Sequence, residues 1–140
     1  MLGVTPPTIT LLFAAACGLI NIWLSVRAGM VRIKGRVMVG DEGNPLMLAR
    51  MRAHANFNEY VPMALIVMAL IELVQGHSNA LWILGAMLVL GRLLHPFGME
   101  RPAPNPWRLG GFLLTWAASV GLIAWAIWIV THPGAGIRYF

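Results

Sequence analysis

The chain has 140 residues, of which 59% are hydrophobic and only 11% are charged, with a net charge of +5. Soluble domains carry about 25% charged residues, so this composition excludes a soluble globular protein. Uncharged runs cover residues 1–26, 73–91 and 109–137. About 20 apolar residues are needed to cross a bilayer, and each of these runs approaches or exceeds that length. A shorter run at 60–71 continues the helical pattern on both sides, which makes four expected membrane helices.

The first half of the chain predicts two helices. The first is expected at residues 8–30, followed by a polar connection at 31–43. The second is expected at 45–75, because Asn44 is a good capping residue and Pro45 suits the first helical position. At 1.5 Å per residue this second helix is about 46 Å long, which exceeds the roughly 30 Å hydrocarbon layer. We therefore expect its first turns to lie among the cytoplasmic headgroups.

The second half predicts two further helices. The third is expected to begin at Ser78 and Asn79 and to end near residues 96–98. Residues 99–106 hold three prolines and are expected to form a stiff loop. The fourth helix opens with Asn105 and Pro106 and is expected to continue to about residue 131. The predicted fold class is thus an all-α integral membrane protein, a single four-transmembrane-helix bundle over residues 1–140.

Basic residues are distributed unevenly along the chain. The N-terminus and the second connection (75–79) carry none, whereas nine of the ten lie around the first and third connections: Arg27, Arg32, Lys34, Arg36, Arg50, Arg52, Arg92, Arg101 and Arg108. Basic residues gather on the cytoplasmic side of membrane proteins. We therefore expect a multi-pass protein with both termini outside the cytoplasm. This distribution explains the positive charge without nucleic acid as a partner.

A polar stripe is predicted on the second helix. Arg52, Asn56 and Glu59 are spaced i, i+4, i+7 and therefore share one helical face. They offer a guanidinium, an amide and a carboxylate, which suit a ligand that carries both carboxylates and an ammonium group. The alternative is a structural ion pair between Arg52 and Glu59 that anchors the helix end.

Arg108 is expected in the first turn of the fourth helix. An arginine there opposes the helix macrodipole, so a function other than helix stability is indicated. Its guanidinium and the free amides of the turn could bind an anion, and Arg27, Arg52 and Arg92 could converge on the same ligand. The alternative is an arginine that reaches lipid phosphates.

The histidines and the cysteine differ in what their positions in the sequence predict. His54 lies about 160° around its helix from Asn56 and therefore faces a different neighbour, whereas His95 follows Arg92 by three residues and is expected near the same site. No spacing resembles a set of zinc ligands, so no metal is expected. Cys17 lies among small apolar residues and is interpreted as a helix contact.

The residues of the second helix resemble a known family signature. Residues 52–62, the Gly-Asp-Glu-Gly-Asn-Pro segment at 40–45, and the Gly-Arg-Leu-Leu-His segment at 91–95 are similar to the MAPEG family, membrane-associated proteins in eicosanoid and glutathione metabolism, and to its bacterial branch. The resemblance extends over essentially the whole chain. It implies a homotrimer in a bacterial inner membrane, with glutathione held between subunits near the cytoplasmic side.

The resemblance also implies roles for individual residues. Glutathione contacts are implied for Arg27, Arg52, Asn56, Glu59 and Tyr60, a contact from the adjoining subunit for His54, and stabilisation of the glutathione thiolate for Arg108. Tyrosines that some eicosanoid-forming members carry near this site are replaced by Met99 and Phe112. The expected activity is therefore a glutathione transferase or peroxidase acting on a lipophilic electrophile or hydroperoxide, without a eukaryotic eicosanoid role.

Two alternatives remain open from the sequence. A MAPEG-like scaffold without catalysis fits the missing tyrosines. A small proton-coupled multidrug exporter would also have four helices, but its essential acid would lie near the middle of the membrane and away from an arginine. Arg52, two turns from Glu59 on the same helical face, speaks against the exporter.

Overall fold

The structure is a computed structural model that describes residues 6–134. It contains four helices, α1 (Thr8–Gly35), α2 (Pro45–Gln75), α3 (Asn79–Met99) and α4 (Pro106–Thr131). All four are long and apolar enough to cross a membrane. The expected all-helical, four-span architecture is therefore confirmed. The expectations for residues 1–5 and 135–140, Arg138 among them, fall outside the described part.

The helix starts follow the capping residues. Asn44 accepts hydrogen bonds through its side chain from the backbone N–H groups of Leu46 and Met47, and Ser78 accepts one from Leu81. Each bond satisfies an amide that has no partner within its own helix. The predicted starts of α2 and α3 are therefore confirmed. They were predictable because a capping residue lies directly before each helix in the sequence.

The end of α1 was predicted too early. The helix continues through residues 31–35, which were expected in the connection. Val31 is buried and packs with Val37 and Met47, so the apolar pattern lasts one turn longer than expected. Lys34 lies in the last turn, where a positive charge complements the helix macrodipole.

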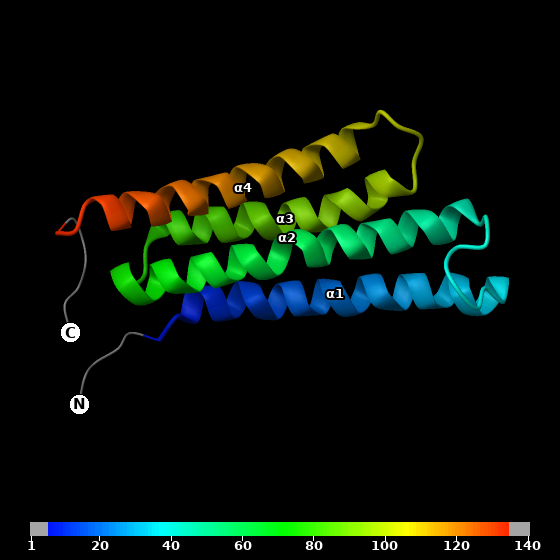
Figure 1. Cartoon of the computed structure of the whole chain (residues 1–140), viewed down its shortest axis with the longest axis horizontal. Helices are drawn as coiled ribbons and strands as arrows, with labels where there is room; N and C mark the ends of the chain where they lie inside the picture. Colours follow the sequence, from blue (N-terminus) through cyan, green and yellow to red (C-terminus); the bar gives the residue numbers. More distant parts are fainter. Residues whose placement is uncertain (1–5, 135–140) are drawn as a thin grey trace.

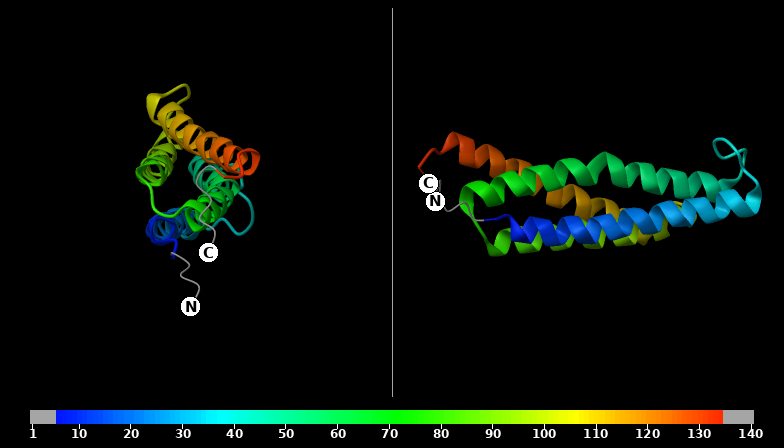
Figure 2. Two further views of the ribbon diagram at one scale, coloured as in Figure 1. Left: turned by 90° about the vertical axis from the view of Figure 1, so that its left-hand side faces the viewer. Right: turned by 90° about the horizontal axis from the view of Figure 1, so that it is seen from below.

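The four helices run antiparallel to their neighbours in sequence (Figure 1). The α1–α2 and α3–α4 connections lie at one end, and the α2–α3 connection lies at the other, together with the start of α1 and the end of α4. The first end carries the nine basic residues around connections one and three, and we call it the basic end. Seen from below, the α1–α2 hairpin extends beyond the α3–α4 end (Figure 2). Within residues 6–134, α1 and α4 do not contact each other.

The core lies along the middle of the bundle. On α1 it takes one residue per turn, including Phe13, Cys17 and Leu24, and the same cluster includes Met68 of α2 and Leu88 of α3. Cys17 is a free thiol that is 2% exposed, which agrees with its interpretation as a packing residue. Many large apolar side chains point outward, as expected for helices that face lipid or another subunit.

A buried glutamate, which was not predicted as important from the sequence, stabilises the end of the bundle opposite the basic end. Glu72 of α2 is 0% exposed. Its carboxylate accepts hydrogen bonds from the backbone N–H of Ile9 at 2.9 Å, and from the N–H and the hydroxyl of Thr10 at 2.7 Å each. A carboxylate is favourable beside the positive end of a helix, so Glu72 caps α1 from another helix.

Candidate functional site

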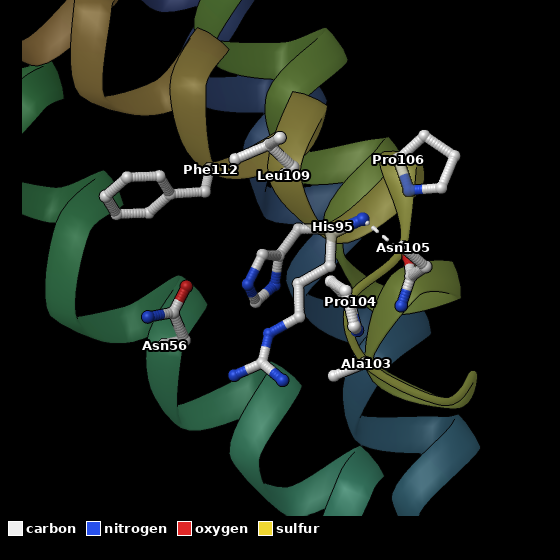
Figure 3. A pocket seen from close by; sticks show the side chains of 9 residues that line it. Asn56, His95, Ala103, Pro104, Asn105, Pro106, Leu109 and Phe112 are labelled. Carbon is white, nitrogen blue, oxygen red and sulfur yellow. Dashed lines mark hydrogen bonds between the residues drawn. The ribbon is translucent and has the colours of Figure 1, made fainter.

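The main pocket opens at the basic end, between α2, the end of α3 and the start of α4. It has a volume of about 680 Å³, within the range of small-molecule sites. Asn56 faces His95 across it, with Phe112 and Leu109 on the apolar side (Figure 3). Arg108 and the segment 103–106 complete the lining. Three residues predicted for the site, Asn56, His95 and Arg108, are thus brought together.

Asn105 fixes the start of α4 at this pocket. Its side-chain oxygen accepts from the N–H of Arg108 at 2.9 Å, and its NH₂ donates to the carbonyl of Gly98 at 2.9 Å. The N–H of Leu109 bonds to the carbonyl of Asn105 at 3.2 Å, and Pro106 has no N–H to offer. The cap therefore uses the amides of Arg108 and Leu109, and of the expected free amides only the N–H of Trp107 has no hydrogen bond within residues 6–134. The guanidinium of Arg108 is exposed and has no hydrogen bond or ion pair within residues 6–134.

Glycines let α3 and α4 approach closely beside the pocket. A Cβ on Gly111 would lie 2.6 Å from the backbone nitrogen of His95, and one on Gly91 would lie 2.6 Å from the hydroxyl oxygen of Thr115. A Cβ on Gly98 would meet the backbone of Arg108. Small residues at such contacts are typical of membrane helix packing. They set the distance between His95 on α3 and Arg108 on α4.

Arg92 lies behind the pocket and is 2% exposed. Its Nε donates to the hydroxyl oxygen of Thr115 on α4 at 2.8 Å. Its Nη1 donates to the side-chain oxygen of Asn56 on α2 at 2.9 Å and to the backbone carbonyl of the same residue at 3.4 Å. The guanidinium also lies 5.7 Å from the ring centroid of Tyr60. Arg92 therefore joins three helices and does not line the pocket itself.

The other two residues of the polar stripe, Arg52 and Glu59, are not among the residues that line the main pocket. Arg52 and Glu59 are exposed, and in the described part of the chain neither side chain has a hydrogen bond or an ion pair. The structure does not contain the alternative Arg52–Glu59 ion pair. Glu59 and Tyr60 line a second, apolar groove of about 250 Å³ between α2 and α4, together with Met63 and Trp116 among others. These two residues therefore lie next to the main pocket and outside it.

His54 faces the opposite side of α2, as its position on the helix predicts. Its Nε2 lies 2.8 Å from the side-chain oxygen of Asn21 on α1, and the NH₂ of Asn21 donates to the side-chain oxygen of Asn58 at 2.7 Å. His54 lines a groove of about 390 Å³ between α1 and α2. From there it cannot reach a ligand in the main pocket of the same chain.

Arg27 also lies away from the main pocket. Its guanidinium pairs with Glu100 at 2.6 Å and stacks over Trp23 with a 4.5 Å distance to the ring centroid. Arg50 shares the same carboxylate at 2.7 Å. Within this chain Arg27 therefore does not meet Arg108 at the main pocket, and Arg92 lies behind that pocket and not on its wall. Two of these cations already have partners, and the start of α2 lies well beyond the start of α4 (Figure 1).

Three of the contacting residues were missed at the sequence level, namely Thr115, Asn21 and Glu100. Each acts through a contact more than 20 positions away in the chain. A polar residue within an apolar helix was the available signal for Asn21 and Thr115. No group of three or more His, Cys, Asp or Glu side chains that could hold a metal ion occurs among residues 6–134.

Comparisons with known proteins address the family of the chain. The MAPEG family model matches residues 10–128. "Inner membrane protein YecN" of Escherichia coli strain K12 is 28% identical over 120 residues, which cover 86% of this chain and 91% of that protein. The protein of the same name from Escherichia coli O6:H1 gives the same values. No solved structure matches the chain. Because the family match extends through all four helices, the chain belongs to the MAPEG family.

Proposed function

We propose that this MAPEG protein is a glutathione-dependent membrane enzyme, a transferase or peroxidase that acts on hydrophobic electrophiles or hydroperoxides. The observation that carries the proposal is the pocket in which the unpartnered guanidinium of Arg108 meets Asn56 and His95. A cation without a partner beside a pocket favours an anionic ligand. Glutathione has two carboxylates, one ammonium group and a thiol that can ionise.

Two charged side chains of α2 that have no partner in the described residues favour glutathione as the ligand. Arg52 has no partner within residues 6–134 and would bind a glutathione carboxylate. Glu59 is equally open and would bind the ammonium group. His54 and Arg27 lie on other faces of the subunit and would reach glutathione from the adjoining subunit of a homotrimer. Glutathione would then lie between subunits near the basic end.

Arg108 would act as the catalytic residue by stabilising the thiolate. A nearby positive charge lowers the pKa of the glutathione thiol and raises the population of the nucleophile at neutral pH. In the transferase reaction the sulfur forms a bond to the electrophilic carbon while the leaving group departs with its bonding electrons, or, at an activated double bond, while the π electrons move to the neighbouring atom and take up a proton. In the peroxidase reaction the thiolate attacks the O–O bond and gives an alcohol, after uptake of a proton, and a sulfenic acid of glutathione. A second glutathione converts that sulfenic acid to the disulfide and water.

The second substrate would come from the lipid. The groove between α2 and α4 is mainly apolar and opens beside Tyr60, and Phe112 adds an apolar surface in the main pocket. A lipophilic molecule dissolved in the bilayer could approach the thiolate along this side. We also propose an inner-membrane location with both termini outside the cytoplasm, which places the basic end in the cytoplasm.

The proposal is tested by glutathione binding to the purified protein in detergent, with S-methylglutathione as the ligand without an ionisable thiol. Arg108→Leu should leave S-methylglutathione binding unchanged and raise the pKa of bound glutathione by about one to two units, since one charge-assisted contact is worth about 1.5–3 kcal/mol. Turnover of a model electrophile at pH 7 should fall about ten- to a hundredfold. Arg108→Lys keeps the charge and serves as the matched control.

Three results would contradict the proposal in different ways. A wild-type protein that binds neither ligand would favour the non-catalytic scaffold. Equal ultraviolet titrations of the bound thiol in wild type and Arg108→Leu would mean that Arg108 does not activate it. Loss of both ligands in Arg108→Leu would place this guanidinium on a glutathione carboxylate instead.

A further inference from the structure

Arg92 is an unusual cation for a membrane protein, because it is buried and its hydrogen-bond partners are neutral. It is 2% exposed, and the hydrogen bonds of its guanidinium go to the oxygens of Asn56 and Thr115. None of the ion pairs within residues 6–134 includes Arg92. Burying a charge without a counter-ion costs several kcal/mol and is tolerated where a function requires it. Structural cohesion alone could be supplied by apolar residues at lower cost.

The contact between Arg92 and Asn56 fixes which end of the amide faces the ligand. The oxygen and nitrogen of an amide are usually hard to distinguish, and the hydrogen-bond network must decide. A guanidinium has donors only, so the oxygen of Asn56 must face Arg92, at 2.9 Å. The NH₂ group then lies on the other side and has no partner in the described part of the chain. Since no buried side-chain nitrogen or oxygen there lacks a partner, this NH₂ is accessible, and Asn56 lines the main pocket (Figure 3).

Thr115 fixes the other side of the guanidinium in the same manner. Its hydroxyl donates to the carbonyl of Gly111 at 2.9 Å, so its oxygen presents lone pairs to the Nε of Arg92. The hydroxyl therefore cannot rotate to compete with the guanidinium as a donor. Arg92 is held in one place by α4 and in turn holds the amide on α2.

We propose that Arg92 is a positioning residue that makes Asn56 a hydrogen-bond donor to the bound ligand. This inference rests on the proposed function and replaces the expectation that Arg92 binds glutathione directly. With the amide held in this orientation, the accessible polar group of Asn56 at the pocket is its NH₂, and the guanidinium of Arg108 is a second donor in the lining. Such a wall selects a carboxylate, carbonyl or thiolate group of the ligand and disfavours a donor group at that place.

The test is a double-mutant cycle with glutathione as the probe. We expect Arg92→Met to weaken glutathione binding about tenfold, the equivalent of one hydrogen bond. The double variant Arg92→Met/Asn56→Ala should bind no more weakly than Asn56→Ala alone, because Arg92 acts only through the amide. Losses that multiply in the double variant would show a direct contact between Arg92 and the ligand and would overturn the proposal.

Asn56→Asp gives a second test that does not depend on removing the buried arginine. The aspartate can still accept a hydrogen bond from Arg92, so the apparent melting temperature should be retained or raised. Glutathione binding should nevertheless fall more than tenfold, because an oxygen replaces the donor in the pocket. Wild-type affinity in this variant would overturn the donor role while leaving the proposed function intact. A wild-type protein that binds no glutathione would overturn both.

Discussion

Two adjacent glycines on α4 should respond in opposite ways to the same substitution. A Cβ at Gly111 would lie 2.6 Å from the backbone nitrogen and 2.8 Å from the Cα of His95. A Cβ at Gly110 would have nothing within 4 Å. Both are helical positions, where alanine is favoured over glycine by about 1 kcal/mol. The comparison therefore isolates the cost of pushing α3 and α4 apart.

The expected magnitude follows from what the new methyl group meets. Overpacking costs about 1–3 kcal/mol, and the upper part of this range applies because backbone atoms cannot move aside as a side chain can. The gain in helix propensity is common to both variants and cancels. We expect Gly111→Ala to be less stable than Gly110→Ala by about 2–3 kcal/mol, or roughly 6–10 °C in melting temperature.

Thermal denaturation of both variants and the wild type in the same detergent measures this difference. Glutathione binding should weaken in Gly111→Ala, because His95 and Arg108 lie on the two helices that separate, and it should persist in Gly110→Ala. A melting temperature of Gly111→Ala equal to or above that of the wild type would refute the close contact between α3 and α4. An equal loss of stability in both variants would refute the assignment of Gly110 to an open surface.

Three further predictions follow from the arrangement. Glu72→Ala leaves three donors of α1 without a partner and should lower the free energy of unfolding by about 3–5 kcal/mol, measured by thermal denaturation. Arg52→Ala and Glu59→Ala should each weaken glutathione binding about ten- to a hundredfold in titration calorimetry, and wild-type affinity in both would exclude them from the site. An engineered Gly43→Cys should react with a membrane-impermeant thiol reagent only after cell lysis, because the basic end is proposed to be cytoplasmic.

The helix boundaries were predictable where the signals are local. The starts of α2 and α4 follow from an asparagine followed by proline, and the side chains of Asn44 and Asn105 cap them as expected. The end of α1 was not predictable in this way, because Val31 near that end packs against Met47 of the next helix. A contact between helices leaves no mark in the composition of one segment.

The candidate site was predictable as a set of residue types and only in part as an arrangement. Asn56, His95 and Arg108 meet as expected at the main pocket. Arg92 was expected to contact the ligand, but its partner Thr115 is 23 positions away, so their pairing could not be predicted from the local sequence. Arg27 was expected at the ligand, but nothing near it in the sequence indicated that its guanidinium pairs within the chain with Glu100, 73 positions distant. Long-range pairing decides which cations remain open for a ligand, and local patterns do not encode it.

His54 and Asn56 lie on opposite faces of α2, and this arrangement favours a glutathione site between subunits of the proposed homotrimer. Asn56 lines the pocket shared with α3 and α4, whereas His54 lines the groove shared with α1. Successive helical residues are 100° apart, so two residues at i and i+2 point in nearly opposite directions. A single small ligand cannot contact both within one subunit. If glutathione is bound by both His54 and Asn56, it must lie between two copies of the chain, so the proposed site requires assembly and a monomer would hold only half of it.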